Sequence, residues 1–422
     1  MWFKRGISQR GREENSAPGR IDVLGGSGRH HGAWVFESVL SCGNRVAVEE
    51  IAGSAVVLAL DGEPSVEFDF QPFKKALRRK APRSELRGLL QQAEIPERGL
   101  CLVSCLLVFC ETRVWIFEEG LRITIDLKVP PDADLGEKSA AEIALLLALE
   151  KLAGRQFLST EAARIAHGAE TDLMGLPSAL ADKLASAYGE PGVLLPILCQ
   201  PDKLYPAIPM PEGVFVVAFP GNESGEERAN AALKARTATV MGQWILEKCL
   251  RRAWHHTADI PLSLFLRYER ENVPLTMKGA PYYELIGSEM PSPLNVYPQE
   301  TYNVNAALRF AIEEHARCST ALALLQDLNE RNRDEGMREF GELMLQSHEG
   351  YSPVGLGSRE ADRRVDALME FGPEHGIYGA RLSGEGVAGT VVALMTRQGL
   401  ARAREIPERT AFLANAVRPL VR

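Results

Sequence analysis

Apolar and polar residues alternate in several short stretches of the first half of the chain. Such alternation is typical of β-strands with one buried face. Residues 33–40, 45–51, 55–60, 113–118 and 121–128 hold β-branched or other apolar residues, and most of these stretches show the alternation. The pairs Asp61-Gly62 and Glu119-Gly120 predict turns beside some of these stretches. We therefore predict a sheet in the first half of the chain.

Helical patterns follow these strands. Residues 139–153 predict a long and largely buried helix that ends at Gly154. Residues 160–167 and 178–188 predict two more helices, with Ser178 as a candidate cap for the second.

The second half is more helical than the first. Three prolines within residues 206–211 indicate a crossing between domains. Beyond them, long helical patterns cover residues 227–254, 303–331, 335–347 and 359–371, and residues 379–395 predict a strand-turn-strand unit. The patterns together predict an α+β fold with two domains, residues 1–205 and 206–422.

Charge and cysteine content narrow the class of protein. The net charge of −8 argues against a nucleic-acid-binding protein, which needs a concentrated positive surface. The most apolar run, residues 100–109, is too short to span a bilayer, so no membrane association is expected. Seven cysteines without a Cys-x-x-Cys pair fit a reducing compartment. With no apolar leader at the N-terminus, we expect a cytoplasmic protein.

Residues 16–26 read S-A-P-G-R-I-D-V-L-G-G, a short apolar strand that carries Arg20 and enters a glycine turn. This motif resembles the first signature of the GHMP small-molecule kinases, the superfamily of galactokinase, L-arabinokinase, homoserine kinase and mevalonate kinase. Two further signatures follow in order, so the resemblance covers about residues 16–395. It implies the two-domain GHMP kinase fold, with an N-terminal mixed sheet with helices and a C-terminal α+β sandwich.

The middle signature of the superfamily is P-x-G-x-G-L-S-S-S-A-A, a loop at a helix N-terminus that holds the phosphates of ATP. The matching stretch here is V-P-P-D-A-D-L-G-E-K-S-A-A-E-I-A, residues 129–144. Both glycines are replaced, by Asp132 and Asp134, and Gly136, Glu137 and Lys138 replace the serine triplet.

By resemblance, Gly136, Lys138 and Ser139 bind the nucleotide, and Glu142 matches the magnesium-binding glutamate. The added carboxylates repel a polyphosphate unless Mg²⁺ or lysine screens them. An ordinary capped helix without any nucleotide role is the alternative interpretation.

Residues 175–183 read G-L-P-S-A-L-A-D-K and resemble the galactokinase pattern G-x-P-C-G-I-M-D-Q. The resemblance implies that Asp182 takes the proton of the sugar's anomeric hydroxyl. Arg20 would then stabilise the ionised carboxylate and the incoming phosphoryl group. The alternative for Asp182 is an aspartate on a helix surface.

The third signature is G-A-R-L-S-G-E-G-V-A-G-T, residues 379–390, in which Gly384, Gly386 and Gly389 let the backbone approach the phosphates. Residues 194–201 and 347–363 are similar to stretches of L-arabinokinases. Within the latter, we interpret His348 as structural.

The glycine turn departs most from the superfamily. Arg29 stands where a sugar-binding aspartate belongs, and Gly26 and His30 are the other candidate substrate residues. A guanidinium cannot accept hydrogen bonds from hydroxyls but binds carboxylates, so Arg29 suggests an anionic sugar such as a uronic acid. His30 is alternatively a residue of the turn alone.

The sequence thus predicts a sugar kinase of the arabinokinase and galactokinase branch. It would use ATP and Mg²⁺ to phosphorylate the anomeric hydroxyl of an arabinose-like or galactose-like sugar or a uronic acid. A non-catalytic protein of the same fold, which binds sugar or a partner, is the alternative. A homoserine or mevalonate kinase is disfavoured by the arabinokinase-like stretches. The oligomeric state is left open.

Overall fold

The computed structural model describes residues 11–155, 158–200, 202–287, 296–406 and 413–414. The chain forms two compact units. The first unit comprises Met1–Arg20, Cys42–Pro130 and Gly136–Tyr188, and the second comprises Ile21–Ser41, Pro131–Leu135 and Gly189–Arg422. The single boundary expected after residue 205 therefore does not describe this division, because the chain passes between the units several times.

Strands β1 (Arg12–Leu24) and β2 (Trp34–Ile51) each contribute to both units. In the first unit, β2 pairs with β5 (Gly120–Asp126), β5 with β3 (Ala55–Leu60), and β3 with β4 (Val66–Asp69). The β3–β5 pair is parallel and the other two are antiparallel, so the sheet is mixed as expected.

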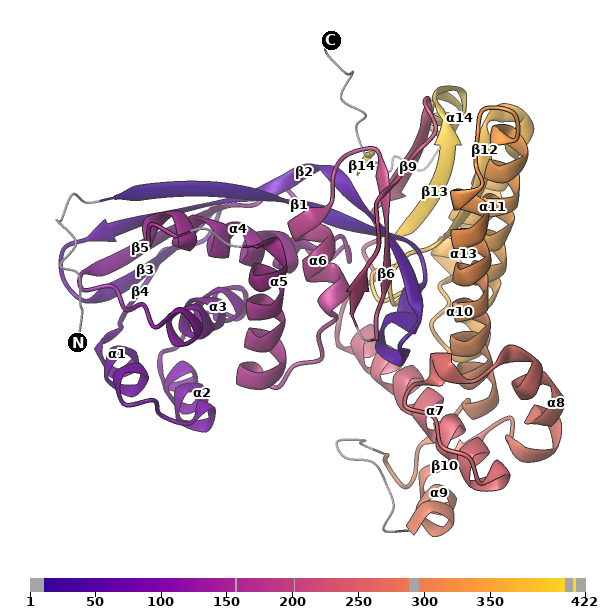
Figure 1. Cartoon of the computed structure of the whole chain (residues 1–422), viewed down its shortest axis with the longest axis horizontal. Helices are drawn as coiled ribbons and strands as arrows, with labels where there is room; N and C mark the ends of the chain where they lie inside the picture. Colours follow the sequence, from indigo (N-terminus) through magenta and orange to yellow (C-terminus); the bar gives the residue numbers. More distant parts are fainter. Residues whose placement is uncertain (1–10, 156–157, 201, 288–295, 407–412, 415–422) are drawn as a thin grey trace. The chain divides into compact units, whose positions relative to one another are not determined.

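Helices cover one side of the first unit's sheet (Figure 1). They are α1 (Gln71–Arg78), α2 (Arg83–Gln92), α3 (Glu97–Arg113), α4 (Glu137–Leu152), α5 (Ser159–Gly168) and α6 (Leu180–Tyr188). The last three correspond to the predicted helices. Helix α4 packs against α3, α5 and α6, which explains why it is apolar around most of its circumference.

The strand expected at residues 113–118 is wrong. Residue Arg113 ends helix α3, and the residues after it form a loop. Helix α3 itself was not predicted, since it is buried on nearly every side and its continuous apolar run has no helical period. Among the described residues, no helix is both long and apolar enough to cross a bilayer.

In the second unit, the first residues of β2 pair with β6 (Val193–Leu198), which also pairs with the short strands β7 (Lys203–Leu204) and β8 (Ile208–Pro209). A separate antiparallel sheet has the order β12 (Ile377–Leu382), β13 (Val391–Thr396), β9 (Val214–Phe219) and β14 (Leu413–Ala414). Strands β12 and β13 confirm the predicted strand-turn-strand unit.

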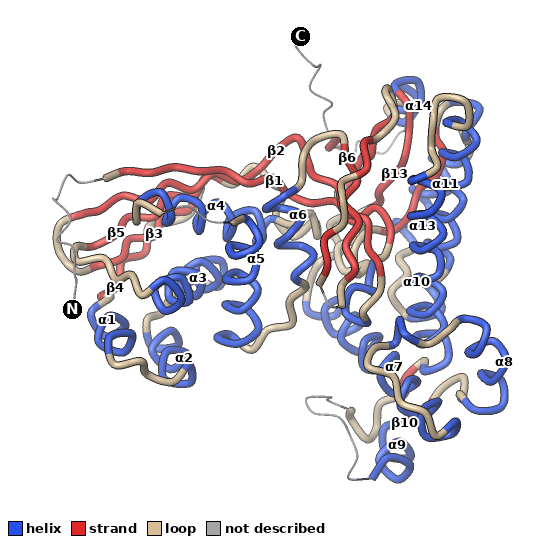
Figure 2. The backbone as a smooth tube through the Cα atoms, in the orientation of Figure 1, coloured by secondary structure: helices blue, strands red, loops and turns tan. Residues whose placement is uncertain are grey.

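The second unit also contains helices, some of which pack against that sheet (Figure 2). The helices are α7 (Glu226–Leu250), α8 (Leu262–Asn272), α9 (Gly279–Ile286), α10 (Val304–Gln326), α11 (Arg333–Glu349), α12 (Tyr351–Val354), α13 (Arg359–Met369) and α14 (Arg397–Ala403). Helix α11 lies directly on β12, where a Cβ atom on Gly341 would come within 2.1 Å of the Tyr378 carbonyl oxygen. The α+β class predicted from the pattern is confirmed.

Candidate functional site

The predicted pair of Arg20 and Asp182 forms within the first unit. Arg20 lies in β1 and Asp182 in the first turn of α6. Arg20 Nε is 3.1 Å from Asp182 Oδ1, and Nη2 donates to Oδ2 at 3.4 Å. The Arg20 side chain is 5% exposed and that of Asp182 is 20% exposed, so the carboxylate keeps access to solvent while the guanidinium is fixed.

Gly136 packs against this arginine. A Cβ atom on Gly136 would lie 2.6 Å from Arg20 Cγ, and the residue has a φ of +75°. Both the contact and the left-handed backbone require glycine. The structure thus brings together three of the predicted site residues, Arg20, Gly136 and Asp182.

The loop before α4 explains the glycines of the superfamily pattern. Asp132 and Asp134, which stand at the glycine positions, have φ values of +57° and +51°. Aspartate is among the few residues that adopt this region readily, because its short side chain bonds locally. The substitution of aspartate for glycine therefore preserves the backbone of the loop while it adds charge.

Lys138 and Ser139, which are also predicted to bind the nucleotide, lie in the first turn of α4. Lys138 is 53% exposed at its side chain, with its Nζ 4.0 Å from Glu97, whereas Ser139 is buried. Glu137 is paired with Arg98 at 3.9 Å, which offsets part of its charge. A helix N-terminus with an exposed lysine is a suitable place for an anion.

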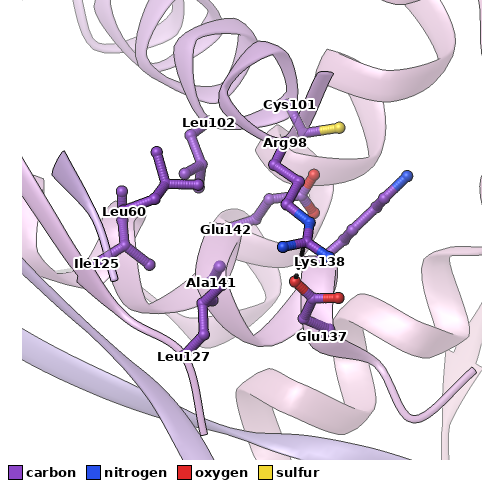
Figure 3. A pocket seen from close by; sticks show the side chains of 10 residues that line it. All are labelled: Leu60, Arg98, Cys101, Leu102, Ile125, Leu127, Glu137, Lys138, Ala141 and Glu142. Atoms are coloured by element: carbon purple, nitrogen blue, oxygen red, sulfur yellow. Dashed lines mark ion pairs between the residues drawn. The ribbon is translucent and has the colours of Figure 1, made fainter. Parts of the chain in front are cut away.

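A small pocket adjoins this helix end within the first unit (Figure 3). Apolar side chains such as Leu60 and Leu102 line it on one side, and Arg98, Lys138 and Glu142 line it on the other. Its volume of about 20 Å³ corresponds to roughly one water molecule. A nucleotide base would therefore enter only after side chains move.

Glu142, the expected magnesium ligand, lies in a buried charged cluster. Its Oε2 atom is 2.5 Å from Lys183 Nζ, and Lys183 is also 2.9 Å from Glu170 Oε2. Ser178 donates a further hydrogen bond to Glu170. Burial raises the pKa of Glu142 above its usual value, and the ammonium of Lys183 opposes this shift by stabilising the carboxylate.

The ammonium of Lys183 remains charged in this cluster. Burial by itself would lower the pKa of Lys183, but the two carboxylates raise it above its usual value. Sequence reasoning missed Lys183 and Glu170. Lys183 stands directly after Asp182, where the galactokinase pattern has glutamine, and this departure was the available signal.

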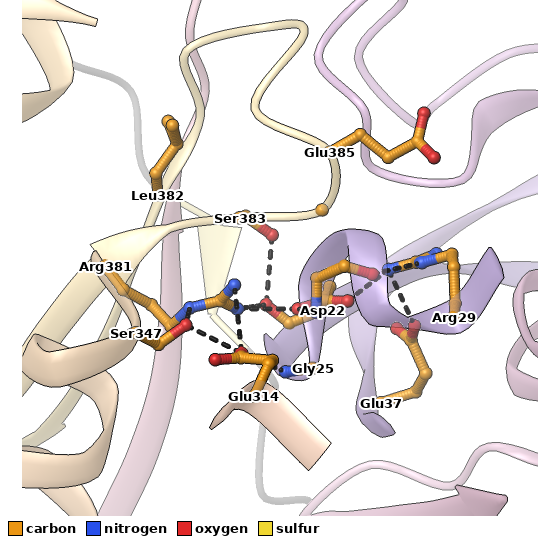
Figure 4. A network of polar contacts seen from close by, with 12 residues as sticks. Asp22, Gly25, Arg29, Glu37, Glu314, Ser347, Arg381, Leu382, Ser383 and Glu385 are labelled. Carbon is orange, nitrogen blue, oxygen red and sulfur yellow. Dashed lines mark hydrogen bonds and ion pairs between the residues drawn. The ribbon is translucent and has the colours of Figure 1, made fainter. Parts of the chain in front are cut away.

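The glycine turn belongs to the second unit, where Gly26–His31 form a 3-10 helix. The Arg29 side chain folds back on this turn, with its Nε donating to the Gly26 carbonyl oxygen at 2.9 Å. Its Nη2 atom binds Asp22 and lies 3.3 Å from Glu37 (Figure 4). The Arg29 side chain is only 2% exposed. The expected contact with an anionic sugar therefore lacks an available guanidinium, because two carboxylates of the protein already hold it.

A second buried arginine joins the same network. Arg381 in β12 is 0% exposed, and its Nη1 is 2.6 Å from Asp22 Oδ1. Glu314 accepts hydrogen bonds from the Gly25 N–H at 3.0 Å and the Ser347 hydroxyl at 2.7 Å (Figure 4). Burial alone would lower the pKa of Arg381, but Tyr351, Asp22 and Glu314 raise it. The signal for this network was a charged residue within an otherwise apolar strand.

The third signature meets the turn and the loop before α4 within the second unit. Gly384, Gly386 and Gly389 have φ values of +59°, +75° and +68°, which favour glycine, and a Cβ atom at any of the three would come within 3.0 Å of a neighbouring side chain. The backbone N–H of Glu385 donates to Asp134 Oδ2 at 3.3 Å. The Glu385 carboxylate binds His30 and Arg236.

His348 accepts a hydrogen bond at Nδ1 from the backbone N–H of Leu382, at 3.2 Å. Burial lowers its pKa. This contact supports the structural interpretation of His348, since the ring fixes the backbone of β12.

Comparison with known proteins agrees with this geometry. Residues 101–190 match the model of the GHMP kinases N terminal domain. The L-arabinokinase of Arabidopsis thaliana is 23% identical over 93% of this chain, which spans 43% of that relative's length. The galactokinase of Chloroflexus aggregans is 25% identical, with 90% of this chain and 83% of the relative covered.

Solved structures share the fold. Lactococcus lactis galactokinase in complex with galactose superposes with a TM-score of 0.68 at 17% identity, covering 96% of this chain and 93% of that one. The mevalonate kinase of Methanococcus jannaschii gives a TM-score of 0.59 at 14% identity, covering 97% and 98%. Residues 101–190 are therefore similar to the N-terminal domain of the GHMP kinases, the chain has the fold of these kinases, and sugar kinases are among its relatives.

Proposed function

We propose that this protein is an ATP-dependent sugar kinase that phosphorylates the anomeric hydroxyl of an arabinose-like or galactose-like monosaccharide. The observation that carries the proposal is the contact of Arg20 with both oxygens of the partly exposed Asp182. These two side chains lie 162 residues apart in the sequence, and the fold brings them together.

Asp182 would accept the proton of the attacking hydroxyl on its carboxylate. Arg20 orients that carboxylate through two charge-assisted contacts. The same guanidinium can offset the charge that spreads over the phosphoryl oxygens during transfer. Proton acceptance and charge stabilisation together form a sufficient set for phosphoryl transfer to a hydroxyl.

The proposal assigns the phosphates of ATP to the N-terminus of α4, at Gly136, Lys138 and Ser139. Lys138 supplies a flexible cation there, since its side chain is half exposed. By resemblance, Gly384, Gly386 and Gly389 of the third signature, all with positive φ, remain candidates for nucleotide binding. Mg²⁺ supplied with the nucleotide would offset phosphate charge.

For the sugar, the proposal assigns Gly26 and His30 of the turn. His30 is 16% exposed at its side chain and is already fixed by Glu385, so it can present one ring face or nitrogen without losing its position. With Arg29 held by Asp22 and Glu37, we favour a neutral sugar over a uronic acid.

Replacing Asp182 by Asn tests the assignment. The amide keeps the size of the side chain but cannot accept the hydroxyl proton, so we expect sugar-dependent ATP consumption to fall by roughly 10²- to 10⁴-fold. A coupled assay for ADP with L-arabinose and with galactose measures the change. The matched control is Asp366→Asn at an exposed position of α13, which should leave the rate unchanged. Equal turnover in both variants would exclude Asp182 from the mechanism.

A non-catalytic, sugar-binding or partner-binding protein is the second candidate. One contact favours it: the Asp134 carboxylate accepts the Glu385 N–H, a donor that a phosphate oxygen could otherwise use. Wild-type protein that binds sugar but neither binds nor consumes ATP would support this candidate.

A further inference from the structure

Asp182 and Lys183 are neighbours on α6, yet they serve different partners. Successive residues on a helix point about 100° apart. Asp182 therefore meets Arg20, whereas Lys183 extends to the two carboxylates of Glu142 and Glu170. Lys183 is 3% exposed, Glu142 is 0% exposed and Glu170 is 10% exposed at the side chain, so this cluster is closed to bulk water.

Among the described residues, one group of side chains could hold a metal ion. It consists of these two carboxylates and the thiol of Cys101. The ligand atoms of Cys101, Glu142 and Glu170 lie within 4.8 Å of one another. Magnesium requires oxygen ligands in a near-octahedral arrangement. Cys101 does not meet this requirement, because sulfur is a soft ligand and Mg²⁺ is a hard cation that prefers oxygen.

The remaining two carboxylates already share a cation. Lys183 Nζ contacts an oxygen of each, at 2.5 Å and 2.9 Å. A Mg²⁺ ion bound to the same oxygens would lie a few ångströms from the ammonium, where two positive charges repel strongly in a buried setting. The residues present therefore do not fit a protein-bound Mg²⁺ at Glu142.

We infer that Lys183 is a built-in cation that takes the place of a divalent metal ion between Glu142 and Glu170. The ammonium binds both carboxylates and excludes Mg²⁺ from them. Any metal in the proposed kinase reaction would then arrive with the nucleotide phosphates and would not be held by Glu142. This inference concerns the metal of the proposed function, but its test needs neither sugar nor ATP.

The test measures Mn²⁺ binding, by electron paramagnetic resonance and by calorimetry, to the nucleotide-free protein. The wild type should bind no Mn²⁺ ion at this cluster. Lys183→Gln removes the charge but keeps a hydrogen-bond donor, so it should gain one Mn²⁺ site, with affinity raised roughly a hundredfold or more. The gained site should also raise the melting temperature of Lys183→Gln when Mn²⁺ is added.

Two controls separate this effect from a general change. Lys183→Arg keeps a cation and should not gain the site. The double variant Lys183→Gln with Glu142→Gln loses one carboxylate ligand and should lose the gained binding.

Two results would overturn the inference. One is a Lys183→Gln protein that folds but gains no Mn²⁺ site. The other is a wild-type Mn²⁺ site that Glu142→Gln abolishes, and this comparison stands even where Lys183→Gln does not fold. A loss of kinase turnover in any of these variants would test the proposed function only. The conclusion drawn from Mn²⁺ binding would stay the same.

Discussion

Buried charged residues in the second unit are held by partners that are distant in the sequence. Asp22 binds both Arg29 and Arg381, and the latter is 359 residues away along the chain. Removing one member of a buried ion pair costs about 3–5 kcal/mol, because the other charge is left in a medium of low polarity. We therefore expect these residues to stabilise the folded state. The superfamily resemblance alone would have assigned Arg29 to sugar binding.

His31 gives a prediction at this scale. The ring is buried, and burial, together with the nearby charges of His30 and Arg236, lowers its pKa to about 3. An unfolded chain protonates this histidine near pH 6.5, whereas the folded protein does not until about pH 3. The stability that neutral His31 contributes is thus complete above pH 6.5 and is lost as the pH falls towards 3.

We expect the wild type to lose about 1.4 kcal/mol of unfolding free energy per pH unit more than His31→Gln between roughly pH 6 and pH 4. Urea unfolding across this range measures the difference. The control is His255→Gln, at an exposed position, which should keep the slope of the wild type. Parallel curves for the wild type and His31→Gln would contradict the prediction.

At the scale of elements, the loop before α4 combines left-handed backbone positions, which glycine favours, with two aspartates. The left-handed residues Asp132, Asp134 and Gly136 alternate with buried Ala133 and Leu135. Glycine is favourable at each left-handed position, so replacing the two aspartates by glycine should leave the fold intact. The same replacement removes two negative charges from a loop that resembles a phosphate-binding loop.

We therefore expect the double variant Asp132→Gly and Asp134→Gly to bind Mg·ATP roughly tenfold more tightly than the wild type. Calorimetry at high nucleotide concentration measures this. The double variant with Asn at both positions is the control, since it removes the charge without the flexibility of glycine and should show most of the gain. If no variant binds nucleotide, the non-catalytic function gains support.

At the scale of the whole molecule, neither unit is a continuous piece of chain. The second unit takes Ile21–Ser41 and Pro131–Leu135 from the first half of the sequence. Those short segments carry Asp22, the partner of buried Arg381, and residues of β2 that pair with β6. A fragment that begins after residue 205 lacks all of them.

We expect the isolated fragment 206–422 to lack a cooperative unfolding transition. Without Asp22, the guanidinium of Arg381 has lost a carboxylate partner and must be exposed or unpaired. Circular dichroism and thermal melting, compared with the full-length chain, measure this outcome. A monomeric fragment with a cooperative melt would contradict it and would favour the single boundary expected from the prolines.

The sequence was sufficient for the helices α4, α5, α6, α7, α10, α11 and α13 and for strand β3, because helix-forming or β-branched composition and the signals at the ends of elements are local. It failed at α3, where burial on all sides removes the periodicity. The signature motifs were also readable, since the positive φ at Gly384, Gly386 and Gly389 favours glycine at those positions. Motif order along the chain was enough to indicate the GHMP kinase fold.

Only the tertiary structure determined which charged side chains form ion pairs with one another. Arg29 matched a sugar-binding position and Glu142 a metal-binding one, yet the first binds Asp22 and Glu37 and the second binds Lys183. A pattern of residues gives the type of each side chain but not its partner. The electrostatic energy of a buried group depends on distances of a few ångströms between residues that are far apart in the sequence. Local propensity therefore determined the elements of this protein, and long-range packing determined what its charged residues can do.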